Sequence, residues 1–209
     1  MKILNLYAGI GGNRKLWGDE HEIVAVEYKP EIAKIYQDHF PSDEMVVGDA
    51  HDYLLHHFQE FDFIWSSPPC PSHSRFRFMT TKMDNPKYSR PIIFPEMKLY
   101  EEIILLKHYF EGKYVVENVK SYYEPLVLPQ SIGRHYFWAN FLITEIKTDN
   151  KGFIKSHANE LKGLHGFDLS EYKLGSRKDQ ILRNCVDPEI GKHILDLAIN
   201  PIILQPTLI

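Results

Sequence analysis

The first 120 residues alternate between short apolar runs and helix-like segments, and this alternation limits the fold more than any other feature of the sequence. Near-continuous apolar runs of this length are typical of strands that are buried on both faces of a parallel sheet. Five such strands are predicted, at residues 2–7, 22–28, 44–50, 61–67 and 113–119. We therefore expect an α/β fold with a doubly wound, mostly parallel sheet, in a single domain of residues 1–209.

Helix signals separate the predicted strands. A short helix runs through Leu16 and Trp17, the next begins at Pro30, and residues 96–110 form the clearest amphipathic helix. Residues 134–146 have the pattern of one or two strands, antiparallel to the others, and residues 188–199 that of a last helix.

The composition argues against several classes of protein. The formal charge of −4 gives no general attraction to nucleic acid, so binding of that kind would need a local basic patch. No apolar run is long enough to span a bilayer, and no charged leader precedes the first predicted strand. Cys70 and Cys185 lie far apart, which argues against a disulfide framework and a four-ligand zinc site, and the histidines lack metal-ligand spacing. We expect a reduced, cytoplasmic protein with no metal and no membrane.

A glycine-rich turn and two acids follow three successive predicted strands. The turn YAGIGGN (7–13) differs from the dinucleotide fingerprint because Arg14 stands where that pattern needs glycine. Glu27 closes the second strand, where a carboxylate commonly binds ribose hydroxyls, and Asp49 closes the third, where it would accept a hydrogen bond from adenine. A single acid is more often a helix cap or a surface residue. The series at one sheet edge nevertheless predicts an adenosine site, which S-adenosylmethionine fits better than NAD or ATP.

The stretch SSPPCPSHSRF (66–76) places Cys70 on a stiff turn at the same edge, with prolines on both sides. A buried structural cysteine is common, but a nucleophile benefits from a rigid turn and from surroundings that favour the thiolate. We expect Arg75 and Arg77 to supply positive potential to this thiol.

The segment from Pro71 to Pro91 has five basic residues against one acid and no clear periodicity. Beside a reactive thiol, such a loop suggests a phosphate-binding lid, and the alternative is a solvated surface loop.

The run VVENV brings Glu117 and Asn118 to the edge that holds Cys70. Because Glu117 follows apolar residues, we expect it to be partly desolvated and its pKa to be raised. A protonated carboxyl there would suit a substrate ring whose nitrogen takes a proton as the sulfur attacks.

These motifs together resemble those of the cytosine carbon-5 DNA methyltransferases, in family order over nearly the whole chain. LNLYAGIGGN, VEYKP and VGDAHD resemble the cofactor motifs, SSPPCPSHS the Pro-Cys nucleophile motif and VVENV the Glu-Asn-Val motif. RHYFWANF is similar to the arginine motif, NELKGLHGF to the ninth motif and LRNCVDPEIGKHI to the last cofactor motif. The resemblance implies the Rossmann-like fold of S-adenosylmethionine-dependent methyltransferases.

The resemblance also implies a mechanism and a set of site residues. The Cys70 thiolate would attack carbon 6 of a flipped-out cytosine while Glu117 holds ring nitrogen 3 and the exocyclic amine, so that carbon 5 takes the methyl group. Arg134 and Asn118 belong to the same catalytic motifs, and Ser74, Arg75, Arg77 and His135 would contact nucleic acid. The residues implied to bind S-adenosylmethionine are Tyr7, Ala8, Gly9, Gly11, Gly12, Glu27, Tyr28, Asp49, Ala50, Pro69, Leu99, Asn184 and Val186.

The chain departs from the family pattern in three places. Pro71 replaces the usual glutamine after the cysteine, and His135 stands near the place of a second arginine, so either Arg134 or His135 meets the cytosine carbonyl. Only residues 143–156 remain where the family has a target-recognition region. We therefore expect low or short sequence specificity, or a partner protein that supplies recognition, in a prokaryotic or phage-encoded enzyme of the kind used in restriction-modification or self-protection.

Two alternatives remain open at this point. In the first alternative the substrate is RNA, such as a tRNA loop, because such loops offer unstacked bases. In the other, the chain is a non-catalytic subunit that binds cofactor and DNA.

Overall fold

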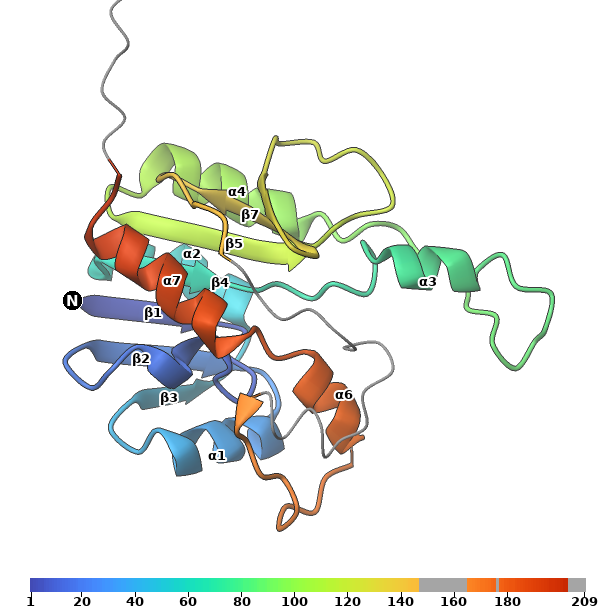
Figure 1. Cartoon of the computed structure of the whole chain (residues 1–209), viewed down its shortest axis with the longest axis horizontal. Helices are drawn as coiled ribbons and strands as arrows, with labels where there is room; N and C mark the ends of the chain where they lie inside the picture. The colour runs from blue at the N-terminus through green and yellow to red at the C-terminus, as the bar shows by residue number, and fades with distance from the viewer. Residues whose placement is uncertain (147–164, 176, 203–209) are drawn as a thin grey trace, which may run out of the picture.

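The computed structural model describes residues 1–146, 165–175 and 177–202, and a single seven-stranded sheet forms its centre (Figure 1). The order is β3-β2-β1-β4-β5-β7-β6; the first five strands are parallel, β7 is antiparallel to β5, and β6 is antiparallel to β7. The strands are β1 (Lys2–Leu6), β2 (Glu22–Glu27), β3 (Glu44–Val47), β4 (Phe63–Ser66), β5 (Lys113–Val119), β6 (Gln130–Ile132) and β7 (His135–Ala139). The predicted doubly wound, mostly parallel sheet is confirmed.

Four of the five predicted strands differ from the observed ones by one to three residues at an end. The predicted strand 113–119 matches β5, but β3 ends at Val47, before Asp49. The Asp49 carboxylate accepts the backbone N–H groups of His51 and Asp52, so the next helix begins at Ala50. Asp49 therefore lies in the turn after the strand and does not close the strand itself.

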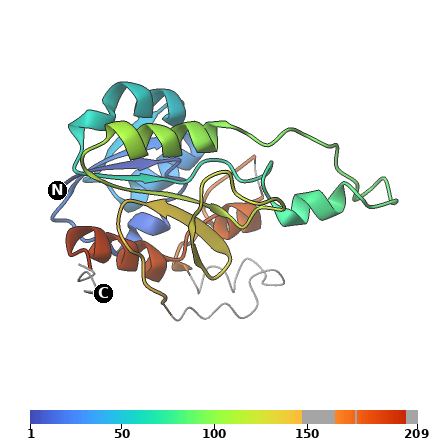
Figure 2. The same cartoon turned by 90° about the horizontal axis from the view of Figure 1, so that it is seen from above.

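Helices cover both faces of the sheet, and strand periodicity explains which side chains each layer meets. On one face, α2 (Ala50–His57) and α4 (Lys98–Tyr109) pack on alternate strand residues such as Leu4 and Ile64. On the other face, α7 (Pro188–Ile199) and the 3-10 helix η1 (Asn13–Leu16) pack on the residues between, such as Ile3 and Trp65. Figure 2 shows these two layers from above, and α1 (Pro30–His39) lies on the α7 side through Ala25 and Tyr36.

Residues 71–97, which we call the arm, project from the carboxyl ends of the parallel strands (Figures 1 and 2). Sequence periodicity predicted no element here, but the arm contains the short helix α3 (Arg75–Thr80), whose first turn is capped by the Ser74 hydroxyl. Six residues are too few for a periodic signal, so the cap was the only local sign of this helix.

The remaining elements are short. They are η2 (Phe58–Glu60) and α6 (Lys178–Arg183). The predicted strand region 134–146 contains β7 alone, because residues 130–132, before it, form the partner strand β6. Of the predicted recognition remnant 143–156, residues 147–156 lie outside the described part of the chain. Within the described part, no helix has the length and apolar character needed to cross a membrane.

Candidate active site

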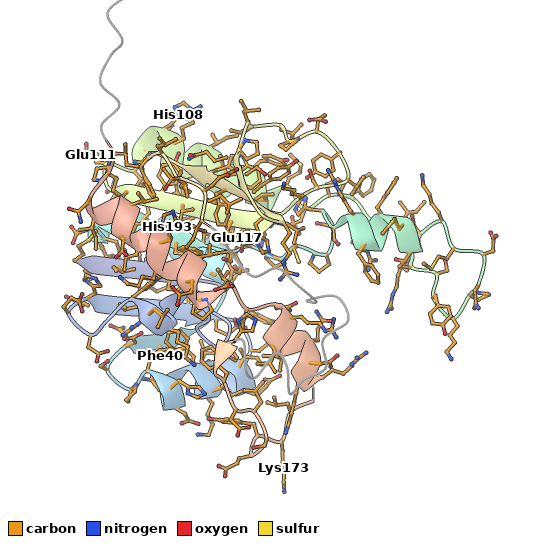
Figure 3. The ribbon with its side chains drawn as sticks, viewed as in Figure 1. Phe40, His108, Glu111, Glu117, Lys173 and His193 are labelled. Carbon is orange, nitrogen blue, oxygen red and sulfur yellow. The ribbon has the colours of Figure 1, made fainter. Side chains whose placement is uncertain are left out.

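The predicted site residues gather at one edge of the sheet, in two neighbouring groups. The parallel register aligns Leu6 with Val26 and Ser66, and Ser66 with Val116, so the turns after these strands lie side by side. We call the turns after β1, β2 and β3, together with the part of α4 that contacts Tyr7, the cofactor half. The thiol half comprises the turn after β4, the end of β5 and the start of β7, where His135 pairs with Val119. In Figure 3, Glu117 lies inside the molecule, whereas Lys173 lies at its rim.

The glycine turn of the cofactor half leaves an open cradle. Gly9 has φ +56°, and a Cβ added to Gly9 or to Gly48 would meet no atom within 4 Å. The Glu27 carboxylate accepts the Gly9 N–H (3.1 Å) and the Lys29 N–H (3.0 Å). Each carboxylate oxygen can accept more than one hydrogen bond, so Glu27 both shapes the turn and has capacity left for ribose hydroxyls.

Asp49 combines a structural contact with an accessible carboxylate. It caps α2, and its other oxygen lies 3.5 Å from the Lys98 ammonium. Burial acts against ionisation, but the backbone N–H groups of His51 and Asp52 and the charge of Lys98 lower the pKa of Asp49. The helix-cap role, which sequence alone left as an alternative, is thus present.

Several predicted cofactor residues have packing roles. A Cβ on Gly11 would collide with Phe40 (2.3 Å), and one on Gly12 with the Val186 carbonyl oxygen (2.5 Å). The other buried members of the set are Ala8, Ala50, Leu99 and Val186. Tyr28, Pro69 and Asn184 are exposed. Direct contact between these residues and a cofactor stays a prediction.

Sequence reasoning missed one residue of the cofactor half, Glu102 on α4. Its side chain is fully buried, and it accepts a hydrogen bond from the Tyr7 hydroxyl (2.6 Å) and another from the Ser66 hydroxyl (2.5 Å). Burial and the Glu102 charge raise the pKa of Tyr7. A glutamate on the apolar face of an amphipathic helix, three residues after Leu99, was a sequence signal that could have revealed it.

Asn118 and backbone hydrogen bonds fix the turn that carries Cys70. The Asn118 amide donates to the Pro68 carbonyl oxygen (2.9 Å), which ties the proline turn to β5. The Cys70 carbonyl oxygen accepts the N–H groups of His73 (3.0 Å) and Ser74 (3.1 Å). Asn118 was predicted among the catalytic residues; its side chain holds the turn that carries Cys70, and a role in catalysis stays a prediction.

The surroundings of Cys70 do not favour the thiolate, which corrects the sequence prediction. Burial, together with the Glu117 charge, raises the pKa of the Cys70 thiol to about 11, and Arg134 acts in the opposite direction. The Arg75 and Arg77 guanidinium groups instead donate to the carbonyl oxygens of Ser121 (2.8 Å) and Pro91 (3.1 Å). The cation that acts on the thiol is therefore Arg134.

Glu117 has the raised pKa that its apolar neighbours predicted. Burial raises the pKa of this carboxyl to about 7, although a hydrogen bond from Ser67 and the charge of Arg134 lower it. His135 Nε2 lies 3.7 Å from Glu117 Oε1, but burial and the charge of Arg134 lower the pKa of His135 to about 3. The imidazole is thus neutral at pH 7, and Arg134 is the charged member of the Arg-His pair.

The arm adds a basic and apolar surface beside the thiol half. A groove of about 220 Å³ lies between α3 and Tyr122, and Ser74, Arg77, Phe78 and Lys82 contribute to its lining. The Ser74 hydroxyl accepts the Arg77 N–H (3.5 Å), so it also serves as the cap of α3.

In the described part of the chain, no group of His, Cys, Asp and Glu side chains could hold a metal ion.

Comparisons with known proteins agree with this geometry. The family model for C-5 cytosine-specific DNA methylases matches residues 1–123. No curated protein matches the chain. Among solved structures, the methyltransferase EhMeth of Entamoeba histolytica has a TM-score of 0.56 at 12% identity and covers 96% of this chain and 98% of its own, a likeness of fold alone.

Two further structures are more distant. A DNMT2 mutant from Spodoptera frugiperda has a TM-score of 0.38 at 25% identity, over 57% of this chain and 35% of that one. A putative DNA modification methyltransferase from an Escherichia coli prophage has a TM-score of 0.41 at 14% identity. The match covers 66% of this chain and 46% of that one. The matched model spans both the glycine turn and the Pro-Cys and Glu-Asn-Val motifs, and the chain belongs to the C-5 cytosine-specific DNA methylase family.

Proposed function

We propose that the protein is an S-adenosylmethionine-dependent DNA (cytosine-5-)-methyltransferase that acts through a covalent Cys70 intermediate. The observation that carries this proposal is the pairing of a partly buried thiol, in the turn after β4, with a buried carboxyl near the end of the adjacent strand β5. Their pKa values are about 11 and about 7, and one arginine acts on both. Such perturbed pairs cluster at catalytic sites.

The cofactor half suits S-adenosylmethionine, which supplies the methyl group when bound. Because the space beside Gly9 and Gly48 is open, a ligand could lie directly against the backbone there. Glu27 would accept the ribose hydroxyls and Asp49 the adenine amine, with Tyr7 and the exposed Tyr28 beside them. The absence of a phosphate-binding loop suits a nucleoside ligand without phosphates.

The thiol and the carboxyl together hold one proton between about pH 7 and 11, and that proton lies on sulfur. Moving it to Glu117 produces both groups that the reaction needs, a thiolate and a protonated carboxyl. The sulfur then forms a bond to carbon 6 of a flipped cytosine, and the electron pair displaced from the ring is stabilised as Glu117 donates to nitrogen 3.

The remaining steps restore the aromatic ring. Carbon 5 takes the methyl group, which leaves the demethylated cofactor. Solvent water then takes the carbon-5 proton, and the ring double bond re-forms as the sulfur–carbon bond breaks. Nitrogen 3 returns its proton to Glu117, and the products are 5-methylcytosine and the Cys70 thiolate. Arg134, being charged, is the better partner for the cytosine carbonyl, while neutral His135 packs beside Glu117. Asn118 keeps the Cys70 turn in register with β5.

Duplex DNA is the proposed substrate, with the arm and Ser74, Arg75 and Arg77 near the phosphates. The segment between Pro71 and Pro91 contains five basic residues and one acidic residue, although the whole protein is acidic. Such a basic segment would bind a polyanion. We propose that residues 1–209 form one catalytic domain in which 143–156 replace a recognition region. The recognised DNA sequence would then be short, or a partner protein would supply the recognition.

Transfer of labelled methyl groups from S-adenosylmethionine to unmethylated duplex DNA tests the proposal, with total tRNA assayed in parallel. Cys70→Ala should abolish transfer, a loss of at least about 10⁴-fold, while cofactor affinity measured by calorimetry stays within about twofold. Cys185→Ala, at the other cysteine, is the matched control and should keep activity. Transfer by Cys70→Ala would overturn the mechanism; label in tRNA alone would replace DNA by RNA.

A further inference from the structure

A buried carboxylate joins three elements that border the cofactor half. Glu102 Oε1 accepts the Tyr7 hydroxyl, which follows β1, and lies 3.0 Å from His51 Nδ1, near the start of α2. Its other oxygen accepts the Ser66 hydroxyl at the end of β4. Glu102 itself is 1% exposed, so water does not compete for these contacts.

Tyr7 needs such an anchor because of its backbone. It is the only residue other than glycine with a positive φ (55°) within the described residues, and it is the first residue of the glycine turn. A side chain in this left-handed region is strained, and such conformations persist only where the surroundings enforce them. The hydrogen bond to Glu102 fixes the far end of the Tyr7 side chain, 95 positions away in sequence.

We propose that Glu102 is a positioning residue for the cofactor: its carboxylate holds Tyr7 and His51, and through them the glycine turn and the start of α2, at the spacing that cofactor binding requires. This inference rests on the proposed function. Glu102 is buried and contacts Tyr7 and His51, so it acts through these two residues.

The charges around the cluster are mixed. His51 Nε2 lies 3.1 Å from Glu101 Oε2, and Lys98 pairs with Asp49 at 3.5 Å. The hydrogen bond to Glu102 raises the pKa of His51; burial and Lys98 oppose this, and Glu101 adds to it. Asp49 and Glu96 act on Tyr7 in the same direction as Glu102. Glu101, with 62% of its side chain exposed, offers a matched control on the same helix.

The experiment measures S-adenosylmethionine affinity by calorimetry, together with KM and kcat, for the wild type and for Glu102→Gln, Tyr7→Phe, the double variant and Glu101→Gln. Glu102→Gln should weaken binding about tenfold and raise KM for the cofactor with little change in kcat. Glu102→Gln removes the charge from this contact and Tyr7→Phe removes its donor, so both substitutions weaken the same charge-assisted hydrogen bond. The double variant should therefore bind little worse than the more affected single variant. Glu101→Gln should stay within about twofold.

The other outcomes oppose the inference, each in its own way. Wild-type affinity in both Glu102→Gln and Tyr7→Phe would overturn it. A lower kcat with unchanged KM and affinity would point to a smaller folded fraction and would also overturn it. A wild-type protein that binds no S-adenosylmethionine would overturn the proposed function first, and this inference with it.

Discussion

The acids of the cofactor half and the acid of the thiol half have opposite environments. Glu27, Asp49 and Glu102 each accept at least two hydrogen bonds from backbone N–H groups or side chains, and these contacts hold turns and helix ends in place. Glu117 is instead buried beside a neutral imidazole and a neutral thiol. A hydrogen bond from Ser67 and the charge of Arg134 only partly offset its burial, and its pKa rises to about 7. One half uses carboxylates as fixed acceptors, and the other keeps a carboxyl close to its titration point, where it can exchange a proton.

The strongest test of this contrast is Glu117→Gln. A glutamine cannot donate a proton to the cytosine ring or take one from the thiol, so kcat/KM should fall about 10³-fold at pH 7, while S-adenosylmethionine affinity stays unchanged. Methyl-transfer kinetics and calorimetry measure the two effects separately.

The pH profile provides the control for that variant. In the wild type, kcat/KM should drop about tenfold per pH unit below pH 7, where Glu117 is already protonated and cannot take the thiol proton, and stay flat from there to about pH 11. In Glu117→Gln the flat region should become a continued rise, because only the thiol titrates. A wild-type profile without a break near pH 7 would contradict the assigned carboxyl.

The same substitution should increase stability. The folded protein binds the Glu117 proton more tightly than the unfolded chain, since the pKa rises from an ordinary 4.5 to about 7. Unfolding free energy is therefore lost as pH rises through this window, about 3 kcal/mol by pH 8. Denaturant unfolding should show Glu117→Gln more stable than wild type by up to that amount at pH 8, and no gain at pH 4. Equal stability at both pH values would mean that the carboxyl is not desolvated.

The smallest expected effect belongs to Asp49 in the cofactor half. Asp49→Ala removes the cap of α2 and should cost about 1 kcal/mol of unfolding free energy, along with cofactor affinity. Asp49→Asn caps as well as aspartate does, so it should restore the stability. If Asp49→Ala were as stable as wild type, the contrast between structural and titrating acids would lose its clearest example.

Much of the frame was predictable because it depends on local signals. The apolar runs indicated five parallel strands, and β5 was predicted with its observed bounds. A strand that is buried on both faces has apolar side chains at consecutive positions, so the run itself marks the strand. The raised pKa of Glu117 also followed from its apolar neighbours in sequence. Helix α3 was not predicted, because six residues give no periodic signal.

Which chemical groups meet at the carboxyl edge follows from the sequence, because parallel strands bring their ends together whatever the details of packing. How those groups behave depends on the tertiary structure. It placed Arg134, 64 positions away in sequence, close enough to act on Cys70, and it turned Arg75 and Arg77 toward backbone carbonyls. It also buried Glu102 beneath Tyr7. Burial and charge pairing depend on distances between residues far apart in the chain, and those distances exist only once the sheet has formed.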